Sequence, residues 1–456
     1  MSETSWPALS IRECLAESFA GEWGAEPLPG NARVLRATDI DDDGHVIGSG
    51  ALRRLPIGKL TSRQLEDGDI LLEGSGGGPD KPVGRVAFFD AAAHQDPAVC
   101  SNFFKTLRPN RRVAEPRFLW RKLMWFYRQP MLLTFQQQTT GIINLKFEEY
   151  LNAAIEVPDD LAEQRAIAQI LDTLDTAIRE TEALIDKLKA VKQGLLHDLL
   201  TRGIDANGQL RPPQSEVPQL YKESPLGWIP KEWEAGKVSN YLESEQGIKP
   251  GPFGSSIKKE SYAETGFKVY GQEQVISGDQ DFGDYFVPLR KYQELQDFSV
   301  KAGDVLISLV GTIGKVLVLK APLQDGLINP RLMRLRPDQR IANSEFVGFL
   351  VASDFFVSQV FANAGGGTMP VINKRIISGI HAPVVPLTEQ IAILKVKAAI
   401  DRRIDSEHLA LAKLREQKSG LMDDLLTGRV RVTPLLESVQ QAAAQIVQQA
   451  VGQMGA

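Results

Sequence analysis

The chain contains two copies of one helical segment, and this internal repeat limits its fold more than any other feature. Residues 163–201 and 389–427 align without a gap at a constant spacing of 226 residues, and 15 of the 39 aligned pairs are identical. Both copies begin with a Glu-Gln pair and end with a Leu-Leu-Thr triplet. A duplicated segment without insertions is typical of a rigid element whose length is constrained.

Apolar residues in each copy recur at alternating spacings of three and four, which predicts two long amphipathic helices that pair as a coiled coil. Forty residues at about 1.5 Å each would form a rod of roughly 60 Å. Two helices of an ordinary bundle are the alternative, although such helices need not share one unbroken register. The positions that we expect to pair or to contact a partner protein are Ile167, Leu171, Leu174, Ile178, Leu188, Gly194, Leu195 and Leu199, and in the second copy Ile393, Ile404, Leu414, Gly420, Leu421 and Leu425.

The segments before the two helices also correspond to each other. Residues 104–109 match residues 332–337 at a spacing of 228, and short apolar runs such as residues 305–307 predict strands. We therefore expect an α/β protein with a pseudo-twofold tandem repeat. The expected parts are a first globular domain at 1–158, a central helix at 159–203, a Pro-rich linker at 204–226, a second globular domain at 227–386, a C-terminal helix at 387–430 and a Gln/Ala-rich tail at 431–456.

Signatures of catalysis are missing from the sequence. The segment Val310–Val316 resembles part of a phosphate loop, but Leu309 stands where the first glycine belongs and Val316 where Ser or Thr would bind magnesium. The two cysteines and five histidines show no metal-ligand spacing, and no Asn/Asp-Pro-Pro-aromatic tetrapeptide marks a methyltransferase. The polar N-terminus and the lone cysteines favour a cytoplasmic protein. We expect a non-enzymatic protein with no metal or cofactor of its own.

Basic and aromatic residues interleave between Phe103 and Arg128, although the net charge of the chain is −5. The aromatic residues there are expected to face the core, whereas the basic side chains suit the phosphates of DNA. The basic candidates for DNA binding are Lys105, Arg108, Arg111 and Arg112.

Polar loops supply further candidates, because amides can pair with adenine while Lys suits guanine or phosphate. Each candidate could equally belong to a plain surface loop. The segment GPFGSSIKK contributes Ser255, Ser256, Lys258 and Lys259, the segment VYGQE contributes Tyr270 and Gln272, and the loops before the two helices contribute Gln138, Thr139, Thr368 and Asn373.

Together these motifs resemble the specificity (S) subunit of type I restriction–modification systems over nearly the whole chain. The resemblance is carried by GWIPKEW (227–233), GPFGSSIKKESY (251–262), VYGQE (269–273) and the paired Glu-Gln…Leu-Leu-Thr helices. The first half departs from the pattern, since it has neither a clear Trp-Ile-Pro-Lys opening nor a GPFGS loop.

The resemblance implies two α/β target recognition domains, here 1–158 and 227–386, joined by two helices that pair as an antiparallel coiled coil. Each domain would read one half of a bipartite target in double-stranded DNA, and the helices would set the spacer. Two methyltransferase (modification) subunits would dock there and supply S-adenosylmethionine, and restriction/translocase subunits could join them. Alternatives are a specificity subunit for a solitary adenine methyltransferase or related phage-defence system, or a coiled-coil interaction protein without a DNA role.

Overall fold

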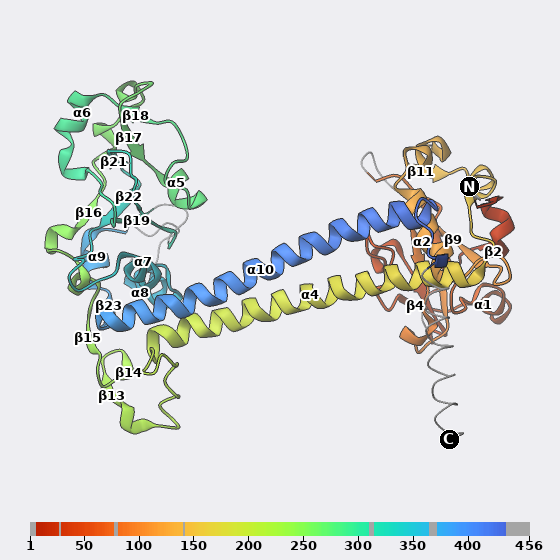
Figure 1. Cartoon of the computed structure of the whole chain (residues 1–456), viewed down its shortest axis with the longest axis horizontal. Helices are drawn as coiled ribbons and strands as arrows, with labels where there is room; N and C mark the ends of the chain where they lie inside the picture. The colour runs from red at the N-terminus through yellow and green to blue at the C-terminus, as the bar shows by residue number, and fades with distance from the viewer. Residues whose placement is uncertain are drawn as a thin grey trace, which may run out of the picture. The chain divides into compact units, whose positions relative to one another are not determined.

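The computed structural model describes residues 6–26, 29–76, 81–139, 142–309, 314–363 and 372–434. The chain forms two compact units: unit 1 comprises residues 1–182 and 409–456, and unit 2 comprises residues 183–408. Two long helices, α4 (Leu161–Thr201) and α10 (Leu387–Leu426), each begin in one unit and end in the other (Figure 1). The repeated segment of the sequence is therefore helical over almost its full length.

Unit 1 contains small sheets covered by helix α2 (Pro116–Tyr127), which buries Phe118, Trp120 and Leu123 in the core. A four-stranded antiparallel sheet has the order β2 (Leu15–Ala20), β9 (Phe104–Pro109), β5 (Ile70–Glu73), β7 (Val86–Phe88). A second sheet has the order β4 (Ala51–Arg53), β3 (Ala32–Leu35), β8 (Ala98–Cys100), with β3 and β8 parallel. The remaining elements are the pair β1 (Ala8–Ser10) and β12 (Ala154–Glu156), the sheet of β10 (Gln136–Thr139), β11 (Ile142–Leu145) and β6 (Ser75–Gly76), and helices α1 (Ile57–Arg63) and α3 (Phe147–Leu151).

Unit 2 repeats this arrangement. Its four-stranded antiparallel sheet has the order β16 (Ile248–Pro250), β22 (Leu332–Leu335), β19 (Val305–Ser308), β20 (Val316–Val318). Its three-stranded sheet has the order β18 (Phe286–Val287), β17 (Phe267–Tyr270), β21 (Gly326–Ile328), again with one parallel pair. The other elements are β15 (Glu234–Lys237) paired with β23 (His381–Val384), the hairpin β13 (Tyr221–Ser224) and β14 (Gly227–Pro230), and helices α5 (Gln272–Ser277), α6 (Leu289–Glu294), α7 (Ser344–Ala352), α8 (Asp354–Asn363) and α9 (Lys374–Gly379).

The two units therefore share one topology, and the predicted α/β tandem repeat is confirmed. The strand orders 2-9-5-7 and 4-3-8 in unit 1 return as 16-22-19-20 and 18-17-21 in unit 2. In both units the strand that precedes a long helix pairs antiparallel with an early strand, β12 with β1 and β23 with β15. Sequence identity is concentrated in the helices, whereas the sheets preserve their connections with few identical side chains.

Helices α4 and α10 run antiparallel within each unit. In unit 1, Asp175 on α4 lies 2.5 Å from Lys418 on α10, and Glu182 lies 2.6 Å from Arg415. In unit 2, Lys192 lies 2.6 Å from Asp401, and Ile204, just after α4, donates its N–H to Glu389 at 2.8 Å. In each unit, ascending numbers on α4 thus meet descending numbers on α10. The Asp175–Lys418 and Lys192–Asp401 pairs also occupy equivalent repeat positions at the spacing of 226.

Most of the positions predicted to pair along the two helices lie between the helices or beneath the sheets. Gly194 and Gly420 are the exceptions, because they are exposed and a Cβ added at either one would meet nothing within 4 Å. The buried positions are Ile167, Leu171, Ile178, Leu199, Ile393, Ile404 and Leu425, and the half-buried positions are Leu174, Leu188, Leu195, Leu414 and Leu421.

Among the described residues, no single helix is long and apolar enough to cross a membrane. The apolar pair α7 and α8 passes that test together, but a bend of 59° separates the two helices. Much of α7 lies in the core of unit 2, where Phe346, Val347 and Leu350 are fully buried. Burial in the core accounts for its apolar composition.

Replacing Asp175 with Asn should destabilise the fold more than the same change at its repeat partner Asp401. Asp175 binds Arg121 and Lys418, whose side chains are only 3% and 11% exposed, so its loss removes the buried carboxylate from both cations and leaves them the more exposed Asp172 and Asp43. We expect a cost of about 3 kcal/mol for Asp175→Asn. The lysines that bind Asp401 are about one-third exposed, and Asp401→Asn should cost less than about 1 kcal/mol. Urea unfolding followed by circular dichroism measures both, and equal losses would contradict the burial argument.

Candidate nucleic-acid interface

The two motifs GPFGS and VYGQE lie side by side in unit 2. The backbone N–H of Gly251 donates to the carbonyl of Leu332, and a Cβ added at Gly251 would come within 1.9 Å of the Asn329 carbonyl oxygen. Only glycine permits this close approach. Asn329 in turn donates its N–H to the carbonyl of Tyr270, at the end of β17. The tertiary structure therefore joins three segments that are far apart in the sequence.

An amide and a guanidinium group meet at this junction. Gln272 is the first residue of α5, and its Nε2 donates to Ser308 Oγ at 2.8 Å. Arg331 Nη1 lies 3.5 Å from Gln272 Oε1, and the Arg331 side chain is exposed. Amide and guanidinium groups are the side chains that most often recognise base edges in the major groove. The predicted residue Gln272 is therefore joined at this junction by an exposed guanidinium group.

Arg331 lies outside every motif that marked the predicted DNA-binding residues. Its backbone N–H donates to Asn329 Oδ1 at 2.9 Å, so the tripeptide Asn329-Pro330-Arg331 forms a turn immediately before β22. An Asn-Pro pair before a predicted strand is the one signal that could have pointed to this turn.

The remaining candidates in unit 2 occupy different environments. Lys258 and Ser255 are exposed and Ser256 is half-buried, whereas the Lys259 side chain lies outside the described part of the chain. Tyr270 is fully buried, and its hydroxyl donates to the Gln324 carbonyl at 2.7 Å, so the structure places it in the core rather than at the surface.

Exposed aromatic rings lie near this surface. Phe253, within the GPFGS loop, is 86% exposed, and the partly exposed rings of Tyr262 and Tyr285 lie 5.5 Å apart. Exposed aromatic groups in a polar loop are available for stacking on a partner, as rings do on unpaired bases or sugars.

Unit 1 has the same junction although the GPFGS sequence is absent there. Gly21 donates its N–H to the carbonyl of Phe104, and a Cβ added at Gly21 would come within 2.1 Å of the Ser101 carbonyl oxygen. The segment Gly21-Glu-Trp-Gly24 thus replaces Gly251-Pro-Phe-Gly254, with Trp23 at the aromatic position. Trp23 is 37% exposed, and the Arg53 guanidinium lies 4.4 Å from the centroid of its ring.

The basic candidates of unit 1 divide into internal and exposed groups. Arg108 binds Asp69 through two bonds of 2.9 and 2.8 Å, and this hydrogen bonding raises the pKa of the Arg108 guanidinium. Unit 2 repeats the pair as Arg336 and Asp304, which indicates a structural role within the fold. The other candidates are less constrained, since Lys105 is half-buried with its Nζ 5.5 Å from the Phe147 ring centroid, and Arg111 and Arg112 are exposed.

The loops before the long helices are only partly described. Asn373 is exposed and caps α9 by accepting a hydrogen bond from the N–H of Ile376 at 3.0 Å. Gln138 and Thr139 lie in strand β10, where the described backbone pairs with Ile143 and Ile142. Their side chains, and Thr368 as a whole, lie outside the described residues.

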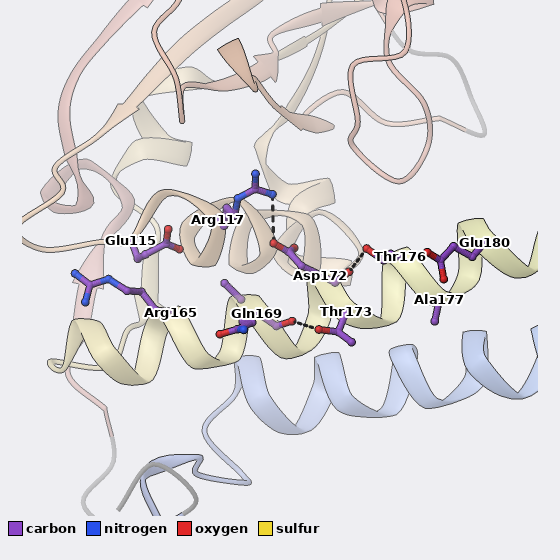
Figure 2. A pocket seen from close by; sticks show the side chains of 10 residues that line it. Glu115, Arg117, Arg165, Gln169, Asp172, Thr173, Thr176, Ala177 and Glu180 are labelled. Carbon is purple, nitrogen blue, oxygen red and sulfur yellow. Dashed lines mark hydrogen bonds and ion pairs between the residues drawn. The ribbon is translucent and has the colours of Figure 1, made fainter. Parts of the chain in front are cut away.

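A groove on unit 1 has no catalytic arrangement among its lining residues, because both of its threonine hydroxyls donate to backbone carbonyls of α4. Figure 2 shows a groove of about 560 Å³ on unit 1, between the start of α2 and the outer face of α4. Arg117 reaches Asp172 across it at 3.2 Å, and the other lining groups are amides, hydroxyls, methyl groups and solvated charges. Within the described residues, no group of three or more His, Cys, Asp or Glu side chains is arranged to hold a metal ion.

Two comparisons of sequence agree with this architecture. A family model for the type I restriction modification DNA specificity domain matches residues 30–190 and 253–416. The type I restriction enzyme MjaVIII specificity subunit of Methanocaldococcus jannaschii is 26% identical over 311 residues, which cover 66% of this chain and 68% of that protein. The putative type I restriction enzyme MjaX specificity subunit of the same organism is 25% identical over 328 residues, with coverage of 72% and 71%.

Solved structures show the same fold. The HsdS subunit from Thermoanaerobacter tengcongensis superimposes with a TM-score of 0.51 at 16% identity, covering 94% of this chain and 98% of that chain. A chain from a structural study of complex assembly and conformational transition of the type I R-M system gives a TM-score of 0.56 at 16% identity, covering 94% and 100%. With both domain matches and both unit topologies in agreement, the chain belongs to the type I restriction–modification DNA specificity family, whose members are specificity subunits.

Proposed function

We propose that the chain reads a bipartite target in double-stranded DNA, with one unit on each half. The observation that carries this proposal is the repeated junction: Gly21 in unit 1 and Gly251 in unit 2 make the same close backbone approach beneath different exposed side chains. Two similar frames with different surface groups are suited to reading two different short sequences. Phosphate contacts would position each unit, and side chains at base edges would specify the sequence.

The long helices provide the physical basis for a fixed spacer between the half-sites. Each helix has about forty residues, and a continuous helix of that length is about 60 Å long. We further propose that two modification subunits dock on the helices and supply S-adenosylmethionine and the catalytic groups for adenine methylation. Restriction/translocase subunits would then join the assembly, whereas a solitary methyltransferase system would lack them.

The proposal is tested by co-expressing the chain with the modification subunit of its own source organism in a host without DNA methylation. Sequencing of the genomic DNA should reveal N6-methyladenine in one motif with two specified parts and an unspecified gap of constant length. A host that expresses the modification subunit alone is the control. Methylation of a continuous motif, or of none despite a stable complex, would contradict the proposal.

Lengthening both helices together should lengthen the gap. Four residues inserted between residues 182 and 183, paired with four between residues 408 and 409, fall at the border of the two units, so the described contacts inside each unit are retained. Four residues add about 6 Å to a helix. The methylated motif should keep both specified parts and gain at least one base pair of gap; an unaltered gap would rule out the helices as the spacer.

Lys258 and Arg331 should make different contributions to DNA binding. We expect Lys258→Ala to weaken binding to all sequences by a similar factor and to reduce the salt dependence, because an exposed loop lysine is suited to contact phosphate. Arg331→Ala should cost about 1–3 kcal/mol on the cognate half-site and relax its specificity. Fluorescence anisotropy of the assembled complex on cognate and scrambled duplexes, at several salt concentrations, separates these effects. If Lys258→Ala changes the sequence preference instead, Lys258 recognises bases and does not merely contact phosphate.

A further inference from the structure

A groove on unit 2 corresponds to a region of unit 1 that the chain itself fills. It is lined by described residues of α4, α7, α8 and α10 and has a volume of about 310 Å³. Leu200 and Phe349 are nearly fully buried at its base, and Leu196 and Phe355 line it as half-buried side chains. The groove is therefore apolar inside, with polar side chains at its edge.

The repeat identifies the matching region in unit 1. The end of α4 corresponds to the end of α10 at a spacing of 226, and α7 corresponds to α2 at a spacing of 228, since Phe118 matches Phe346. Helix α2 continues to Tyr127, but α7 ends at Ala352 because Ser353 has an extended backbone, and α8 departs at 59°. The last turn of α2 consequently has no equivalent beside α4 in unit 2.

That last turn of α2 places an indole ring against the end of α10. Trp125 Nε1 donates to Asp423 Oδ1 at 2.8 Å. Lys122 Nζ lies 4.9 Å from the centroid of the ring and donates to the carbonyl of Leu426 at 2.5 Å. The corresponding positions in unit 2 are Ser353 for Trp125 and His197 for Asp423, so neither the ring nor its acceptor is present.

The charges at the edge of the groove also differ from those in unit 1. Lys418 in unit 1 has two carboxylates near it, Asp175 at 2.5 Å and Asp43 at 3.4 Å. Its counterpart Lys192 shares the single carboxylate of Asp401 with Lys397, at 2.6 and 2.8 Å.

Lys192 and Lys397 thus share one carboxylate at this edge. Asp354, the one carboxylate among the described residues that line the groove, forms no ion pair with either lysine. A carboxylate from outside the chain would complete the pattern that Asp43 provides in unit 1.

We propose that this groove binds an aromatic side chain flanked by a carboxylate on the modification subunit. The inference rests on the proposed function, because it requires that subunit as a partner. The ring would fill the apolar groove as Trp125 fills the equivalent space in unit 1, and the carboxylate would pair with Lys192 and Lys397. An aromatic anchor in an apolar pocket with complementary charge at its edge is typical of the residues that dominate protein–protein affinity.

Filling the groove from within tests the proposal. Ala352 lines the groove and is exposed, so Ala352→Trp can occupy the space without displacing the core. Titration of the full chain with the purified modification subunit, by isothermal calorimetry, should show at least a tenfold rise in the Kd of one binding event. Ser358→Trp, an exposed position on α8 outside the groove, is the matched control and should leave every Kd within about twofold.

A charge reversal provides a second and independent variant. Lys397→Glu should weaken the same binding event several-fold, and Lys395→Glu, an exposed residue on the same helix that does not line the groove, should not. Circular dichroism and the thermal midpoint of each variant establish that the fold is retained. The weakening should diminish at high salt, because Lys192 and Lys397 are each about one-third exposed and salt screens their charges.

The chemistry of the partner is read out by crosslinking. A photoreactive amino acid in place of the exposed His197, which lines the groove, should attach to a segment of the modification subunit that contains an aromatic residue next to Asp or Glu. Attachment to a segment without that pair overturns the proposal. Equal binding of the modification subunit by wild type, Ala352→Trp and Ser358→Trp would also overturn this inference, but that result would leave the proposed function intact. If the wild-type chain binds no modification subunit at all, the proposed function fails together with this inference.

Discussion

The buried glutamine at the start of each long helix is the contact on which the rest of the structure depends. Gln164 accepts a hydrogen bond from the N–H of Glu115 and donates to the carbonyls of Val113 and Pro158. Gln390 makes the same three bonds, with the backbone of residues 343, 341 and 385. One fully buried amide thus satisfies three backbone groups where the sheets meet the helix. Losing it would leave these groups unpaired, which costs about 1–3 kcal/mol for each one.

The neighbouring glutamate fixes the other helix in the same unit. Glu163 binds Arg431, just beyond the end of α10, and Glu389 binds Arg211, beyond the end of α4. The chain turns toward each arginine through a glycine with positive φ, Gly203 at 64° and Gly428 at 72°. A Cβ at Gly203 would come within 2.3 Å of the Trp233 ring, so the turn also requires the absence of a side chain. Each unit therefore clamps the start of one helix to the end of the other.

The sequence predicted the parts of the fold that depend on local periodicity, and it missed those that depend on distant partners. The helices and the tandem repeat could be predicted because apolar spacing and internal identity are read from the sequence without the tertiary structure. Arg108 was predicted to bind DNA because it lies among basic residues. Its partner Asp69 is 39 positions away, so the ion pair between them could not be seen in the local sequence. Arg331 was missed because its relation to Gln272 arises only when β17 and β22 are brought together. Tyr270 was placed at the surface by its motif, but its strand is buried on both faces.

The contrast between a repeated clamp and unrepeated surfaces explains how one frame can serve two recognition tasks. The glutamates and glutamines of the clamp are buried, so replacing them should cost stability in the whole unit. The side chains above Gly21 and Gly251 are exposed and do not hold the unit together. Phe103 in unit 1 occupies the position of Arg331 in unit 2, and both are exposed. A phenyl ring and a guanidinium group cannot form the same hydrogen bonds with a base edge. Under the proposed function, the two half-sites therefore differ in sequence, and the target as a whole is asymmetric.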